Sequence, residues 1–217
     1  MNDFLLVGGG AHRTGENSAG GKYGNLRKTA QKFFPNGREV ANWSAQDCMT
    51  LDGVPYIGQY SSSTPNLFVA TGFGKWGMTT SMVSAMIISD LIQDKPHPYE
   101  IFSPQRFKPS VSAKSLMDEA AHAVKGLSSG IFNIPDAKLN DIPSGHGGLI
   151  EHDGQKVGVY KDESGEVFTV SARCTHLGCQ LEWNPDELSW DCPCHGSRFD
   201  YHGDLIDNPA MENLHKN

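Results

Sequence analysis

Two short segments near the C-terminal end of the chain place the strongest limit on what it can fold into. The first is Cys174-Thr-His176-Leu-Gly-Cys179, and the second is Cys192-Pro-Cys194-His195-Gly-Ser197. Four of the five cysteines in the 217-residue chain lie in these segments, interleaved with histidine. Clustered cysteines alone are typical of disulfide scaffolds in small secreted proteins, whereas cysteines alternating with histidines are typical of metal ligation. We therefore expect a metal centre in this region.

Each segment supplies one cysteine and one histidine, spaced as Cys-x-His and as Cys-x-x-His with fifteen residues between the two pairs. A 2Fe–2S cluster needs four ligands, and replacing two thiolates by two imidazoles on one iron raises its reduction potential. A turn at Asn184-Pro185 would let the two segments face each other across such a cluster. The alternative is a structural zinc site, although zinc ligands more often pair as Cys-x-x-Cys and His-x-x-x-His.

These two segments resemble the cluster-binding loops of the Rieske family, and the resemblance covers about residues 131–217. It implies that Cys174 and Cys192 bind one iron, and that His176 and His195 bind the other. It also implies a disulfide between Cys179 and Cys194, a pair that the high-potential branch has and that the ferredoxin-like domains of ring-hydroxylating dioxygenases lack. Such a disulfide is unusual in a reducing compartment, but burial beside a cluster would keep thiols away from it.

The same resemblance assigns three further positions around the cluster. Ser197 matches the serine whose hydroxyl donates a hydrogen bond to a cluster sulfide. Phe199 stands where quinol-oxidising Rieske proteins usually carry a tyrosine, and the loss of that donor predicts a lower potential than theirs. The run Asp207-Asn-Pro-Ala210 resembles the proline-containing loop that shields the cluster, with Asn208 in place of the usual glycine.

The remaining sequence predicts an α+β segment followed by an all-β domain of small antiparallel sheets. In the first part, strands are expected at residues 4–10, 38–45, 55–58 and 67–70, and helices at 24–34, 78–92 and 111–126. Thr79 or Thr80 is expected to cap the second of these helices. In the last part, turn residues at 162–165, 184–187 and 202–203 separate short β runs. We accordingly divide the chain into residues 1–110, a helix and glycine-bounded linker at 111–130, and a domain at 131–217.

Residues 1–108 resemble the C-terminal part of FAD-dependent oxidoreductases of the D-amino-acid oxidase type. The resemblance rests on the stretches Gly8–Gly15, Trp43–Asp47, Asp52–Gly58 and Ala70–Thr79. It implies that a glycine loop and a helix N-terminus present Gly74, Trp76, Gly77, Met78 and Thr79 to a flavin, because a helix dipole favours negative charge on the reduced ring.

The dinucleotide fingerprint of that family is not found in this sequence. At Gly8-Gly9-Gly10-Ala11-His12-Arg13, arginine stands where the third glycine should close the helix against the strand. We therefore expect the chain to be the back end of a longer enzyme, with FAD bound in that full-length parent and not in this chain.

Charge and composition bear on partners and location. Residues 1–112 carry a net charge of +2 and residues 113–217 a net charge of −9. The acidic half argues against nucleic acid and suits either a basic redox partner or plain solvated surface. The N-terminal residues do not read as a secretory signal and no apolar run is long enough for a membrane anchor, so we expect a cytoplasmic protein. The isolated Cys48 is expected to be a buried, inert thiol.

Together these features predict a Rieske-type protein that transfers single electrons through a 2Fe–2S cluster, without catalytic side chains of its own. Its expected partner is a flavoprotein or another redox protein, in a flavin-linked oxidoreductase of amines or amino acids. Two alternatives remain open. One is a functional FAD-dependent half that needs a partner chain, and the other is a zinc-stabilised binding module.

Overall fold

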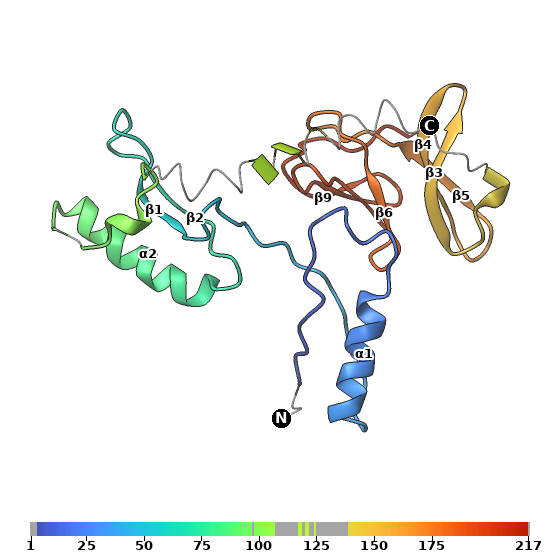
Figure 1. The fold of residues 1–217 in the computed structure, drawn as a ribbon, viewed down its shortest axis with the longest axis horizontal. Helices are drawn as coiled ribbons and strands as arrows, with labels where there is room; N and C mark the ends of the chain where they lie inside the picture. Colours follow the sequence, from blue (N-terminus) through green and yellow to red (C-terminus); the bar gives the residue numbers. More distant parts are fainter. Residues whose placement is uncertain are drawn as a thin grey trace. The chain divides into compact units, whose positions relative to one another are not determined.

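The protein is described by a computed structural model, which covers residues 4–96, 98–106, 117–118, 120–121, 124 and 139–216. The chain divides into two compact units, one formed by Ala45–Glu119 and the other by Met1–Ser44 together with Ala120–Asn217 (Figure 1). The helix predicted at 111–126 and the linker predicted at 126–130 lie almost entirely outside the described residues. Each unit is considered by itself.

The unit Ala45–Glu119 contains a two-stranded sheet and one long helix. Strand β1 (Tyr56–Gln59) pairs antiparallel with β2 (Phe68–Thr71). Helix α2 (Gly77–Ile92) packs on this sheet. Ile87 of the helix and Ile57 of β1 are both buried. A short 3-10 turn, η1, follows at Glu100–Phe102. The predicted strands and helix are confirmed here.

Two details of this unit differ from expectation. Thr79 does not cap α2, because the helix begins earlier, after Trp76, and the Thr79 hydroxyl donates a hydrogen bond to the Trp76 carbonyl from within the first turn, at 3.1 Å. Cys48 is exposed and not buried, since it lies on a stretch without regular structure that precedes β1.

A partly buried ion pair links Arg106, which follows η1, to the loop before β1. Arg106 donates two hydrogen bonds to the carboxylate of Asp52, both at 2.8 Å, and its guanidinium lies 4.0 Å from the centre of the Tyr56 ring. The hydrogen bond from Arg106 holds the pKa of Asp52 well below its usual range, against the opposing effect of burial. The pair therefore fixes the loop at residues 50–55 that precedes β1.

The second unit carries two antiparallel sheets. One has the order β3-β4-β5, with β3 at His146–His152, β4 at Gln155–Lys161 and β5 at Val167–Ser171, and the short turn η2 (Leu139–Asp141) precedes it. The other has the order β6-β7-β8-β9, formed by Glu182–Asn184, Ser189–Asp191, Arg198–Asp200 and Leu205–Asp207. Both hairpins predicted from turn residues, at 162–165 and 184–187, are present.

Aromatic side chains fill the core of this second unit. Trp190 and Phe199 are register partners on β7 and β8 and are fully buried. Two glycines let neighbouring strands approach the rings of Trp190 and of Trp183, which is also buried. A Cβ at Gly158 would lie 2.9 Å from Trp190, and one at Gly147 would lie 2.5 Å from Trp183. Glycine at these two positions is thus required by close packing.

Helix α1 (Lys22–Phe33) belongs to the second unit but buries none of its own residues. It matches the helix predicted at 24–34 and begins two residues earlier. The strands predicted at 4–10 and 38–45 are wrong, since neither segment has strand structure. Strands need a partner, and among the described residues these segments pair with none, so their apolar side chains Phe4, Leu6 and Val40 stay exposed.

Candidate metal centre

The two cysteine–histidine loops are closed by the same backbone hydrogen bonds. In the first, the Cys174 amide donates to the Cys179 carbonyl and the Gly178 amide donates to the Cys174 carbonyl, both at 2.9 Å. In the second, the Cys192 amide donates to the Ser197 carbonyl at 2.8 Å, and the Gly196 amide donates to the Cys192 carbonyl at 3.0 Å.

Each loop therefore spans six residues with glycine at its fifth position. Gly178 and Gly196 have φ values of 76° and 86°, in the left-handed region where glycine is unstrained. Identical closure explains why the two sequence motifs share their length and their glycine, although the histidine stands at the third position in one and at the fourth in the other.

The first cysteine of each loop supplies a buried thiol. Cys174 is 3% exposed and Cys192 is 1% exposed, and the two thiols hydrogen-bond to each other. This bond from Cys192, helped by the backbone amides of His176 and Leu177 and by the Ser197 hydroxyl, lowers the pKa of Cys174 to about 6, while burial opposes the change. The same contact and burial raise the pKa of Cys192. The two thiols therefore lie close enough to act together as ligands.

The two imidazoles meet beside the thiols. The rings of His176 and His195 are 4.9 Å apart between centroids and nearly perpendicular, at 86°. The Nδ1 atom of His176 is buried and has no hydrogen-bond partner within the described part of the chain. A buried nitrogen without a partner costs free energy unless it binds something. Two facing imidazoles and two facing thiols therefore fit the ligand set of a 2Fe–2S cluster with mixed coordination.

The remaining two cysteines of the loops form a disulfide. Cys179 and Cys194 are bonded to each other, with their Cα atoms 6.6 Å apart, and both are buried. The sulfur atoms of Cys179, Cys192 and Cys194 lie within 4.8 Å of one another. Because the disulfide occupies two of these sulfurs, only Cys192 of the three keeps a thiol that can bind a metal. The disulfide ties the two loops together at the back of the site.

A third loop joins both cluster loops. It follows β9, contains a cis peptide bond between Asn208 and Pro209, and buries Ala210. The Ala210 amide donates a hydrogen bond to the Ser197 hydroxyl at 2.9 Å, and the Thr175 hydroxyl donates one to the Glu212 carbonyl at 2.8 Å. Ser197 therefore links the third loop to the Cys174 sulfur.

A buried polar network that was not predicted from the sequence lies at the base of the second loop. Asp191 directly precedes Cys192 and Arg198 directly follows Ser197, and their side chains form an ion pair at 3.2 Å. Asp191 also accepts hydrogen bonds from Ser189 and Asn184, both at 2.8 Å. The signal that could have revealed the pair is the presence of opposite charges on two strands that immediately bracket a metal-binding loop.

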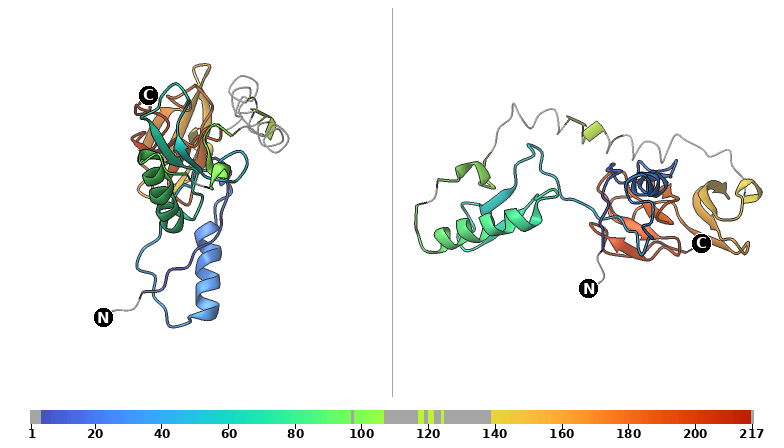
Figure 2. Two further views of the ribbon diagram at one scale, coloured as in Figure 1. Left: turned by 90° about the vertical axis from the view of Figure 1, so that its left-hand side faces the viewer. Right: turned by 90° about the horizontal axis from the view of Figure 1, so that it is seen from below.

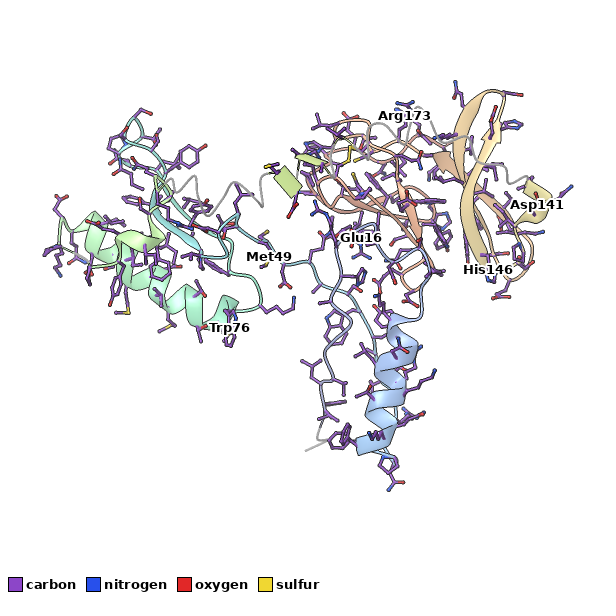
Figure 3. The ribbon with its side chains drawn as sticks, in the orientation of Figure 1. Glu16, Met49, Trp76, Asp141, His146 and Arg173 are labelled. Atoms are coloured by element: carbon purple, nitrogen blue, oxygen red, sulfur yellow. A yellow bond between two sulfur atoms is a disulfide. The ribbon has the colours of Figure 1, made fainter. Side chains whose placement is uncertain are left out.

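The residues predicted to contact a flavin lie in the unit Ala45–Glu119. A cavity of about 510 Å³ is lined there by Gly74, Trp76 and Thr79, among others. Gly77 and Met78 do not line it, and Met78 is 89% exposed. Figure 3 places Trp76 beside the start of α2, with Met49 on the stretch before β1. The structure therefore gathers three of the five predicted residues around a cavity.

Two protein-family models match this chain, and they are the two families that its sequence resembles. Residues 133–216 match the model of the Rieske [2Fe-2S] domain, and residues 1–91 match that of the FAD dependent oxidoreductases. Among the described residues we find no helix with the length and apolar character needed to cross a membrane.

Curated relatives include one that spans nearly the whole chain. It is a putative Rieske 2Fe-2S iron-sulfur protein, YhfW, of Bacillus subtilis, 41% identical over 97% of this chain; the chain spans 42% of that relative's length. Two cytochrome b6-f complex iron-sulfur subunits are similar over shorter stretches. The subunit of Chlorobaculum thiosulfatiphilum is 33% identical over 33% of this chain and 39% of its own length. The subunit 1 of a Nostoc species is 46% identical over 24% of this chain and 31% of its own length. The chain thus carries a Rieske [2Fe-2S] domain, preceded by a segment of the FAD dependent oxidoreductase type.

Proposed function

We propose that this chain transfers electrons one at a time through a 2Fe–2S cluster held by Cys174, His176, Cys192 and His195. The observation that carries the proposal is the buried Nδ1 of His176, which lacks a partner within the described residues although it lies in a site with two free thiols. When bound, a cluster with this ligand set takes up and returns a single electron at a potential above that of an all-cysteine cluster.

The protein's own groups set how that site behaves. The two cysteine ligands are buried, whereas the His195 side is exposed, so electrons reach the site from the histidine face. The Ser197 hydroxyl donates toward the Cys174 sulfur and thereby stabilises negative charge on it. Phe199, fully buried beneath the loop, offers no second donor, which supports a potential below that of Rieske proteins with tyrosine at this position.

We further propose that the electron partner is a flavin of an oxidoreductase that oxidises amines or amino acids. Two observations support this link: the match of residues 1–91 to FAD dependent oxidoreductases, and the cavity beside Gly74, Trp76 and Thr79. A second candidate is that this chain works as the flavin-binding half of such an enzyme together with another polypeptide, which the same cavity favours. In either case, the net negative charge of residues 113–217 suits a basic redox partner.

The ligand assignment is tested by replacing each histidine separately. His176→Ala and His195→Ala should each abolish the EPR signal of the reduced cluster and the iron content of the purified protein. His152→Ala is the matched control, because His152 is an exposed histidine of the same unit. An unchanged spectrum in either ligand variant would refute the assignment, and a colourless, EPR-silent protein with bound zinc would support a structural zinc module instead.

A further inference from the structure

The turn between β6 and β7 caps a helix from the other end of the chain. The carboxylate of Asp186 accepts hydrogen bonds from the backbone amides of Gly21, at 3.0 Å, and Lys22, at 2.7 Å. These amides open helix α1, whose own N-cap residue, Gly21, has no side chain to satisfy them. Free amides at a helix N-terminus and the helix dipole both favour a carboxylate. The cap of α1 is therefore supplied by the Rieske domain, as the start of α1 beside β6 illustrates (Figures 1 and 2).

A buried asparagine strengthens this contact. Asn17 is 3% exposed, and its amide donates to the Asn184 side-chain oxygen at 2.9 Å and to Asp186 at 3.1 Å. The Tyr23 hydroxyl donates to Glu187 from the first turn of α1. Burial raises the pKa of Asp186, but the hydrogen bonds from Asn17, Lys22 and Gly21 outweigh it and lower that pKa overall. The carboxylate is thus held in its charged form.

Two glycines face two prolines across the same contact. A Cβ at Gly15 would lie 2.7 Å from the Pro193 ring, and one at Gly20 would lie 2.7 Å from the Pro185 ring. Both glycines also have positive φ values, 82° and 64°. Only glycine fits both the backbone conformation and the space at these positions. The surfaces are therefore complementary in shape as well as in hydrogen bonding.

This contact reaches the second cluster loop by two routes. Pro193 lies inside the loop, and its carbonyl accepts a hydrogen bond from Arg13 at 3.4 Å. Asn184, which accepts from Asn17, donates to Asp191 at 2.8 Å, and Asp191 directly precedes the ligand Cys192. A chain of contacts therefore joins the N-terminal segment to Pro193 within this loop and to Asp191 at its base.

We propose that residues 13–23, part of the FAD-oxidoreductase-type segment, dock onto the 184–187 turn and Pro193, and that this docking holds the second cluster loop in its ligand-binding conformation. Asn17 and Asp186 are positioning residues, since they act on the cluster through the loop. The inference rests on the proposed function, because the loop conformation matters only with a bound cluster. It makes the cluster site depend on a segment outside residues 133–216, the part that matches the Rieske [2Fe-2S] domain.

Hydrogen exchange and EPR of the holoprotein test this docking. Asp186→Ala should speed exchange at the Gly21 and Lys22 amides about fivefold or more, as expected for loss of a helix cap, and should also speed exchange at the Cys192 and Gly196 amides. The EPR lines should broaden, because a less constrained loop gives a wider range of ligand geometries. Asp186→Asn should restore only part of both readouts, because asparagine keeps one acceptor oxygen but places a donor NH2 where the second carboxylate oxygen accepts.

A second pair of variants covers the case in which Asp186→Ala fails to fold. Gly15→Ala should displace the segment from Pro193 and reproduce the faster exchange and broader lines, whereas Gly24→Ala should not, because nothing lies within 4 Å of a Cβ there.

The outcomes separate the two proposals. Wild-type exchange rates at Gly21 and Lys22 in both Asp186→Ala and Gly15→Ala would overturn the contact. Faster exchange there with unchanged loop amides and unchanged EPR lines would overturn its effect on the cluster loop. An unaltered protein without any EPR signal would count against the proposed function, and the exchange data would still decide whether the contact exists.

Discussion

Asp191 and Arg198 form a buried ion pair at 3.2 Å, one residue outside each end of the second cluster loop. The two residues are also register partners on β7 and β8, so the pair closes the base of the loop. Arg198 further contacts Glu187 at 3.1 Å and Asp207 at 3.3 Å, which connects the loop to the 184–187 turn and to the start of the third loop. One guanidinium thus organises three segments around the site.

Replacing Arg198 should therefore be strongly destabilising. Arg198→Met leaves the Asp191 carboxylate buried without its partner, and breaking a buried ion pair costs about 3–5 kcal/mol. Chemical unfolding of the holoprotein measures this loss, and Arg38→Met, at an exposed arginine of the same unit outside the cluster loops, is the control. Equal losses in the two variants would contradict the role assigned to the pair.

Ser197→Ala should lower both stability and reduction potential. The change removes the acceptor of the buried Ala210 amide, and an unsatisfied buried amide costs about 1–3 kcal/mol. It also removes the donor that stabilises negative charge on the Cys174 sulfur, so the reduced state becomes less favourable. Voltammetry should show a lower midpoint potential than in the unaltered protein. A potential that stays the same would leave Ser197 with a purely structural role.

Phe199→Tyr should raise the midpoint potential, because a hydroxyl at this fully buried position can donate to a ligand sulfur. Phe168→Tyr is the matched control, since Phe168 packs on the aromatic core and lies outside the cluster loops. If voltammetry finds the same potential in the Phe199 variant as in the unaltered protein, Phe199 has no part in setting it.

Acid should release the contact between α1 and the Rieske domain. The folded-state pKa of Asp186 is lowered below its unfolded value of about 3.9, so its contribution to stability is fully present above that pH. The contribution is lost as the pH falls through the lower, folded-state pKa. Protection of the Gly21 and Lys22 amides, corrected for intrinsic exchange, should hold from pH 7 to pH 5 and fall below pH 4. Constant protection down to pH 2 would contradict this account.

Added FAD should leave the melting temperature of this chain unchanged. Residues 4–10 form no strand that could carry a dinucleotide-binding turn, and only three of the five predicted flavin contacts line the cavity. A ligand that binds the folded state raises the melting temperature, and the rise grows with the logarithm of the ligand concentration relative to its dissociation constant. A clear rise with FAD, absent with an equal concentration of AMP, would favour the chain as a flavin-binding half.

Local chemistry made much of this fold predictable. The hairpins at 162–165 and 184–187 follow from turn residues. The predictions failed where structure depends on a partner, because the apolar run at 4–10 reads as a strand but has no strand partner among the residues that the structure describes. The cap of α1 was also out of reach, since Asp186 lies 164 residues from Lys22 and a cap is normally sought next to its helix.

Analysis of iron and acid-labile sulfide in the freshly purified protein tests the central claim most directly. We predict about two irons and about two sulfides for each chain, as a single 2Fe–2S cluster requires. The dithionite-reduced protein should then give an EPR signal with an average g value below that of the free electron. Finding neither iron nor acid-labile sulfide would contradict the account.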